Sequence, residues 1–183
     1  MPDLRQATRV RLGLFGYGFI AKAHMAGLQR IPQAEVVGLC GPNLERATAF
    51  ATEWRIPKVT QEPAELLSIR ELDAVIVDTP DAAHAELTLA AARAGKHVFC
   101  EKPLAVSLEQ AQHMAAAIHA AGLRSCMGFS NRWNPTFLHV RTLINAGEVG
   151  AIRHVHAQAF NAGLTGPLPT FGWRSDATQT GAG

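Results

Sequence analysis

The stretch Val10-Arg11-Leu12-Gly13-Leu14-Phe15-Gly16-Tyr17-Gly18-Phe19-Ile20-Ala21 decides the fold of this chain. A mostly apolar run is followed at once by two glycines and, three residues later, by an alanine. This order is typical of a strand, a tight turn and a helix start that together cradle the diphosphate of a dinucleotide. Gly16 permits the turn, Gly18 lets the backbone approach the diphosphate, and Ala21 suits close packing of the helix on the strand.

The helix that follows the turn begins with backbone amides that can bind a negatively charged group. The amides of Phe19 and Ile20 open this predicted helix, and a helix N-terminus favours an anion. An ordinary glycine turn has the same residue pattern. Here, however, the turn follows the first strand, where a dinucleotide-binding domain needs it. The sequence therefore predicts a dinucleotide site at this turn.

Strand-like and helix-like segments alternate regularly up to about residue 130. Strands are predicted at 9–15, 35–40, 58–60, 73–78, 96–100 and 124–129, and helices near 19–30, 43–54, 63–69, 82–94 and 107–121. Apolar strands separated by amphipathic helices indicate a parallel sheet that is covered on both faces. We therefore predict an α/β chain whose residues 1–130 form a doubly wound, NAD(P)-binding Rossmann domain.

The rhythm changes after this point. Residues 135–146 are predicted to form a helix that ends at Gly147, and the alternation over 151–160 predicts a strand buried on one face. One helix and one strand cannot close a core of their own. We therefore expect residues 131–183 to be the incomplete beginning of a second domain.

Composition narrows the class of protein. The chain is 48% hydrophobic and 17% charged with a net charge of +2, which is typical of a soluble globular protein without a nucleic-acid surface. No apolar run approaches the ~20 residues of a membrane span. The three cysteines are far apart and form no CxxC pair, which favours a cytoplasmic location and burial as small apolar side chains. His154 and His156 lack further ligands, so no metal site is predicted.

The end of the second predicted strand bears on the choice of cofactor. Cys40 and Gly41 stand where an acid would bind the adenosine ribose hydroxyls and favour NAD. The first acid after them is Glu45. Arg46 is close enough in sequence to meet a 2′-phosphate, although it is equally compatible with a solvated helix position. The cofactor is thus NADP or NAD, with NADP slightly favoured.

Two later strand ends carry polar groups, and ligands bind at strand ends in open α/β sheets. Thr79 and Pro80 follow the fourth strand, where Thr79 is expected to meet the nicotinamide or its ribose; His84 is either a ligand-side group or a helix-start residue. Glu101 and Lys102 follow the fifth strand. We predict that Lys102 is catalytic, binding a substrate hydroxyl and helping to move its proton while Glu101 orients it. The alternative is a surface ion pair.

Together these motifs resemble the Gfo/Idh/MocA family, the glucose-fructose oxidoreductases and inositol dehydrogenases. The matching stretches are, in order, Gly16-x-Gly18-x-x-Ala21 followed by His24, Thr79-Pro80 with His84, Gly95 to Glu101-Lys102-Pro103, Arg132-x-Asn134-Pro135, Gly147-Glu148-Val149-Gly150 and Trp173-Arg174. The match covers essentially the whole chain. It implies that residues 131–183 begin a substrate-binding and oligomerisation α/β domain with an open sheet. It also implies an NAD(P)-dependent oxidoreductase that acts on a sugar or polyol hydroxyl or the matching ketone, and a homo-oligomer in the full-length form.

The resemblance also implies roles for single residues. Lys102 would lie in the active site, often with a cis bond to Pro103, and Arg132, Trp173 and Arg174 would lie near the cofactor and substrate. Family members run to about two ordinary domains and carry an Asp-x-x-x-His acid/base element, which this sequence lacks. We therefore expect a truncated form of such an enzyme. The alternative is a non-catalytic dinucleotide-binding module or an inactive fragment.

Overall fold

A single parallel sheet forms the centre of the computed structural model, which describes residues 9–158 and 177–180. The strand order in this part of the chain is β3-β2-β1-β4-β5-β6, and every neighbouring pair is parallel. The strands are β1 (Val10–Phe15), β2 (Ala34–Cys40), β3 (Val59–Thr60), β4 (Ala74–Val77), β5 (His97–Cys100) and β6 (Ser125–Met127). The predicted Rossmann fold is confirmed, and all the strands predicted within residues 1–130 are present.

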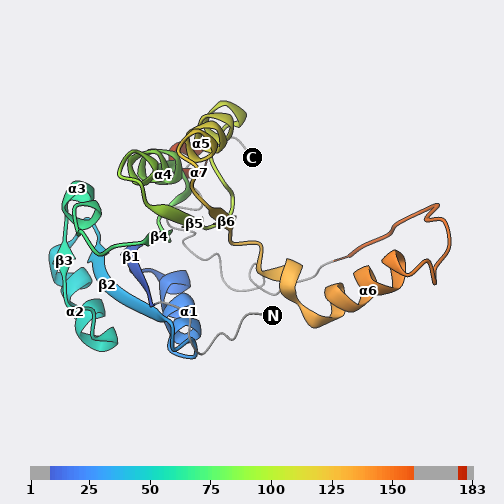
Figure 1. Cartoon of the computed structure of the whole chain (residues 1–183), viewed down its shortest axis with the longest axis horizontal. Coiled ribbons are helices and arrows are strands. Elements are labelled where there is room, and N and C mark those ends of the chain that lie inside the picture. Colours follow the sequence, from blue (N-terminus) through green and yellow to red (C-terminus); the bar gives the residue numbers. More distant parts are fainter. Residues whose placement is uncertain (1–8, 159–176, 181–183) are drawn as a thin grey trace.

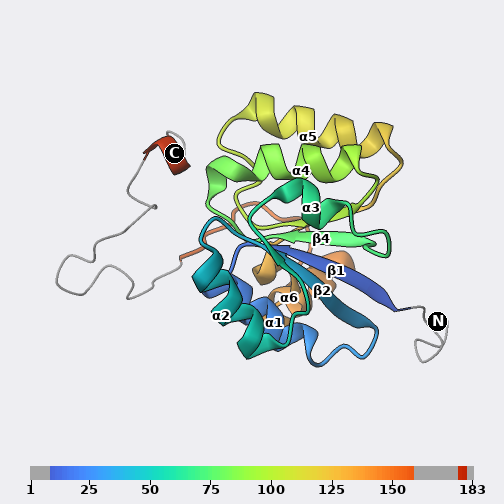
Figure 2. The same ribbon diagram turned by 90° about the vertical axis from the view of Figure 1, so that its left-hand side faces the viewer.

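Helices cover both faces of this sheet. They are α1 (Phe19–Leu28), α2 (Leu44–Trp54), α3 (Pro63–Leu67), α4 (His84–Arg93) and α5 (Leu108–Ala120), with a 3-10 turn η2 (Asp81–Ala83) before α4. Figure 2 shows α1 and α2 on one side of the sheet and α3, α4 and α5 on the other. Side chains cap two of these helices: Asn43 accepts from the amide of Arg46 and Ser107 from that of Gln110.

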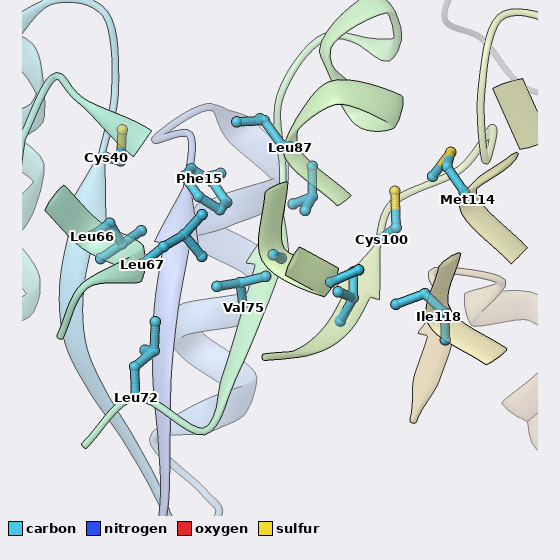
Figure 3. Close-up of a cluster of buried hydrophobic side chains, with 14 of the residues drawn as sticks. Phe15, Cys40, Leu66, Leu67, Leu72, Val75, Leu87, Cys100, Met114 and Ile118 are labelled. Atoms are coloured by element: carbon cyan, nitrogen blue, oxygen red, sulfur yellow. The ribbon is translucent and has the colours of Figure 1, made fainter. Parts of the chain in front are cut away.

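The two faces of the sheet have separate apolar cores. Leu12 and Leu14 of β1 are buried in the cluster that includes Phe50 of α2. Phe15 and Val75 are buried in the other cluster, with side chains of α3, α4 and α5 (Figure 3). Burying a side chain of this size contributes about 1.5–3 kcal/mol. Burial on both faces explains why the strands are apolar runs rather than alternating patterns.

The chain leaves the sheet after β6. It forms a 3-10 turn η3 (Ser130–Trp133), which was not predicted, and helix α6 (Pro135–Asn145), which was. Gly147 with φ +76° follows the helix. Figure 1 shows α6 extending away from the sheet, and no residue of α6 is buried. The strand predicted at 151–160 is not formed over 151–158, and residues 159–160 lie outside the described part. No described strand lies beside this segment, so its backbone has no ladder partner.

A short helix, α7 (Ala177–Thr180), packs beside η2. Within residues 9–158 and 177–180, no helix combines the length and apolar character that crossing a membrane requires.

Candidate functional site

A cleft of about 520 Å³ opens at the C-terminal ends of β1 and β4. In the sheet, β1 lies between β2 and β4, so the chain builds the sheet outward from β1 in one direction up to β3 and in the other direction from β4 onward. The strand order therefore reverses between β1 and β4, which is where open α/β sheets bind ligands. The cleft is lined by Gly16, Tyr17, Gly18, Phe19, Ile20, Pro42, Arg46, Asp78, Thr79, Pro80, Asp81, Glu101 and Lys102. Eight of the predicted cofactor residues are therefore brought together here.

The two glycines of the turn differ in their surroundings. Gly16 is packed against the protein backbone, whereas Gly18 faces open space. Gly16 has φ +102°, and a Cβ there would lie 2.5 Å from the carbonyl oxygen of Asp78. A Cβ on Gly18 would meet nothing within 4 Å. Gly18 is followed directly by α1, which has no side-chain cap and no acid in its first turn. The uncapped amides beside an open backbone fit a diphosphate group.

Tyr17 forms the wall of the cleft beside the end of β2. Its hydroxyl accepts from the amide of Asn43 at 3.2 Å, and the Arg46 guanidinium lies 5.4 Å from its ring centroid. A Cβ on Gly41 would overlap the Tyr17 ring, so the glycine makes room for the aromatic side chain. From the sequence, Gly41 was interpreted only as a residue that stands in place of an acid. Tyr17 stands between the two turn glycines, and this position in the sequence could have identified it as a residue of the cleft.

The end of β4 carries an unpaired hydroxyl. Thr79 Oγ1 is buried without a hydrogen-bond partner among the described residues. Such a group costs free energy unless a ligand or water satisfies it, which fits a polar group of a bound cofactor. His84 does not line the cleft. It is fully buried, with Nδ1 2.7 Å from the carbonyl oxygen of Pro103 and Nε2 3.0 Å from that of Thr79, so it ties two loops of the site together.

Asp78 and Glu101, which line the cleft, both face the imidazole of His24, which is not among the lining residues. His24 Nδ1 lies 2.9 Å from Asp78 Oδ1, and His24 Nε2 lies 3.4 Å from Glu101 Oε1. Burial by itself lowers the pKa of His24, but the hydrogen bond to Asp78 and the charges of Asp78 and Glu101 outweigh it, so the pKa is raised. Beside them, Lys102 lies at the cleft with its side chain exposed, and the Lys102–Pro103 bond is cis, as the resemblance implied.

The other predicted residues lie elsewhere. Cys40 is buried below the turn, where its carbonyl oxygen accepts from the amide of Gly16 at 2.9 Å. Arg132 does not line the cleft and stacks over Phe129 at 5.1 Å. Trp173 and Arg174 lie outside the described residues.

The cysteine prediction holds for two residues and fails for one. Cys40 and Cys100 are buried, whereas Cys126 is exposed, so the expectation that it would be a buried small side chain was wrong. Cys126 lies on β6, the edge strand, where no further strand lies beside it in the sheet.

The parallel sheet, the switch-point cleft and the uncapped glycine turn define a Rossmann domain of the dinucleotide-binding class. Residues 10–129 match the model of the Gfo/Idh/MocA oxidoreductase family, described as an NAD-binding Rossmann fold. The chain belongs to this family.

Relatives extend the match beyond the Rossmann domain. The chain is 38% identical over 175 residues to the 1,5-anhydro-D-fructose reductase of Ensifer adhaerens, covering 94% of this chain and 51% of the reductase. It is 34% identical over 143 residues to scyllo-inositol 2-dehydrogenase (NAD(+)) of Bacillus subtilis, and this match covers 78% of this chain and 42% of the dehydrogenase. The crystal structure of an oxidoreductase domain protein from Kribbella flavida superposes with a TM-score of 0.85 at 35% identity. This superposition covers 97% of this chain and 50% of the Kribbella protein. The chain thus spans about half the length of these relatives or less.

Proposed function

We propose that this chain is the cofactor-binding part of an NAD(P)-dependent oxidoreductase that oxidises a hydroxyl of a sugar or polyol, or reduces the matching ketone. One observation carries the proposal: the glycine turn, the unpaired hydroxyl of Thr79 and the amine-bearing Lys102 share one cleft at the switch point of the sheet. The relatives named above, an anhydrofructose reductase and a scyllo-inositol dehydrogenase, support the substrate class.

The residues of the cleft would divide the work as follows. A bound nicotinamide supplies or accepts the hydride. The amides at the start of α1 would hold the diphosphate, and the hydroxyl of Thr79 would gain a partner. Lys102 hydrogen-bonds the reacting oxygen of the substrate and holds the proton that this oxygen gains or loses. Glu101 accepts from the backbone amide of Lys102 at 3.0 Å, which fixes the start of the lysine loop.

We further propose that NADP binds at least as well as NAD. Arg46 lines the cleft beside Tyr17, near the end of β2, and no acid among Cys40, Gly41 and Pro42 would repel a 2′-phosphate. The guanidinium over the Tyr17 ring is therefore the group placed to pair with that phosphate.

Cofactor binding is tested by titrating residues 1–183 with NADPH and NADH, following the fluorescence of the reduced nicotinamide. Gly18→Ala places a methyl group in the diphosphate cradle and should weaken binding about tenfold or more, a loss comparable to one charge-assisted hydrogen bond. Gly27→Ala is the matched control, since a Cβ on either glycine meets nothing within 4 Å. If neither cofactor binds, or if Gly18→Ala binds as the unaltered chain does, the proposal is wrong.

The second candidate is a dinucleotide-binding module without catalysis, since most of the residues that line the cleft belong to the proposed cofactor site and Lys102 alone is proposed to handle a proton. The two candidates differ in hydride transfer. The assay follows NAD(P)H absorbance with scyllo-inositol and 1,5-anhydro-D-fructose, using Lys102→Ala and the exposed-lysine control Lys58→Ala. Turnover that Lys102→Ala abolishes and Lys58→Ala retains supports the enzyme. Firm cofactor binding with no turnover supports the module.

A further inference from the structure

We propose that His24 is a positioning residue: as an imidazolium it bridges Asp78 and Glu101 and thereby fixes Glu101 under the Lys102 loop. The functional meaning of this bridge rests on the proposed role of Lys102. The bridge itself is a property of the cofactor-free protein.

The bridge joins three elements of the fold. His24 lies on α1, Asp78 follows β4, and Glu101 follows β5. His24 Nδ1 is 2.9 and 3.0 Å from the two oxygens of Asp78, and its Nε2 is 3.4 Å from Glu101 Oε1. The Asp78 side chain is fully buried and that of Glu101 is 9% exposed. The Phe99 ring packs against that of His24 in a T-shaped arrangement, with ring centroids 5.1 Å apart and planes at 86°.

This geometry calls for a doubly protonated ring. Ionised carboxylates only accept hydrogen bonds, so Nδ1 of His24 must carry a proton to bond Asp78. A second proton on Nε2 gives the ring the positive charge that pairs with Glu101 at 3.4 Å. Two buried carboxylates without a cation would also repel each other strongly. The side-chain types would suit a metal ion, since three ligand atoms lie within 4.8 Å, but His24 already supplies the cation between the carboxylates. The raised pKa of His24 agrees with this arrangement.

The bridge reaches Lys102 through Glu101. Glu101 Oε2 accepts from the Lys102 amide at 3.0 Å while Oε1 faces His24. On the far side, Gly128 leaves room for the carboxylate, because a Cβ there would overlap Glu101 Oε1. The backbone amide of Glu101 donates to Val77 at 3.0 Å, which anchors the residue to β4. Glu101 therefore has one orientation as long as His24 holds its free oxygen.

Other charged groups near the bridge do not replace His24. Lys22 on the same helix pairs with Glu53 at 3.5 Å, and both of these side chains are about half exposed. Asp81, buried in η2, adds a further negative charge near the cleft, and Lys102 is exposed. His24 is thus the cation that faces both carboxylates among the described residues.

The first test follows the ring protons and nitrogens of His24 by NMR in the cofactor-free chain. We expect the titration midpoint of His24 to lie above the ~6.5 of an unperturbed histidine, and Asp78→Asn to lower it. A midpoint at or below the unperturbed value in the unaltered chain would overturn the bridge. This result needs no variant to fold and no cofactor to bind.

The second test reads Lys102. Acylation of lysines by an amine-directed reagent, mapped by mass spectrometry across a pH series, gives the labelling rate of Lys102 relative to that of Lys58. We expect His24→Gln to change this labelling ratio about threefold or more. The same variant should remove the inflection that the plot of the ratio against pH shows in the titration range of His24. His113→Gln, a control at an exposed position, should change neither the ratio nor the inflection. An unchanged profile in His24→Gln would refute the positioning role. Failure to bind either NADPH or NADH would refute the proposed function but leave both readouts standing.

Discussion

Gly16 and Asp78 approach each other so closely that a single methyl group would not fit between them. A Cβ on Gly16 would lie 2.5 Å from the carbonyl oxygen of Asp78, and φ at Gly16 is +102°. The contact joins the first βα turn to the end of β4, the two sides of the cleft. Gly16→Ala should therefore lower the free energy of unfolding by about 2 kcal/mol or more, from backbone strain and the overlap together. Urea denaturation measures this change.

Gly18→Ala is the comparison for this prediction. A Cβ on Gly18 meets open space, so this variant should keep the stability of the unaltered chain within about 1 kcal/mol while losing cofactor affinity. Equal stability of Gly16→Ala and Gly18→Ala would contradict the distinction between the two glycines.

A second prediction concerns Arg46. Because the guanidinium lines the cleft beside Tyr17, Arg46→Ala should weaken NADPH binding about tenfold and change NADH binding little. The selectivity of the unaltered chain for NADPH should also fall as salt rises. Arg70→Ala, at an exposed position outside the cleft, is the control. An equal loss for both cofactors would show that Arg46 does not contact the 2′-phosphate.

The sequence predicted those features that depend on local order along the chain. Apolar runs separated by amphipathic segments predicted the strands, and the Gly16-x-Gly18 turn located the cleft. The His24 bridge could not be predicted in this way, because Asp78 is 54 positions away and its approach depends on the packing of α1 on the sheet. Likewise, the alternation over 151–160 indicated a strand, but a strand also needs a neighbour that no residue pattern supplies.

A third prediction concerns pH and stability. The pKa of His24 is raised by folding, so the stabilisation from its charged form is fully present below the unfolded value of ~6.5 and is lost as the pH rises through the folded value. The difference in unfolding free energy between the unaltered chain and His24→Gln should therefore be about 1–3 kcal/mol near pH 6 and clearly smaller near pH 9. Denaturation curves at both pH values test it, and a difference that grows with pH would contradict the sign.

A fourth prediction concerns the three thiols. Burial raises the pKa of Cys40 to about 11 and that of Cys100 to about 12, so neither forms much thiolate at neutral pH. Cys126 is exposed. A disulfide reagent such as DTNB should label one thiol quickly in the folded chain and all three after unfolding. Cys126→Ser should remove the fast phase, and a fast phase that survives this change would place the reactive thiol elsewhere.

The last prediction concerns the apolar face of α6. Phe137, Val140 and Ile144 are 56%, 46% and 39% exposed, and their spacing puts them on one face of the helix. Trp133, 66% exposed, lies in η3 just before the helix. An uncovered apolar surface of this kind favours association. We expect residues 1–183 to associate as concentration rises, and Phe137→Glu to reduce that association.

The control for this prediction is Leu108→Glu, which removes an exposed apolar side chain from the start of α5 and should leave the association unchanged. Light scattering coupled to size-exclusion chromatography measures the mass of each variant. A monomeric unaltered chain at high concentration, or equal association of both variants, would show that this face does not drive self-contact.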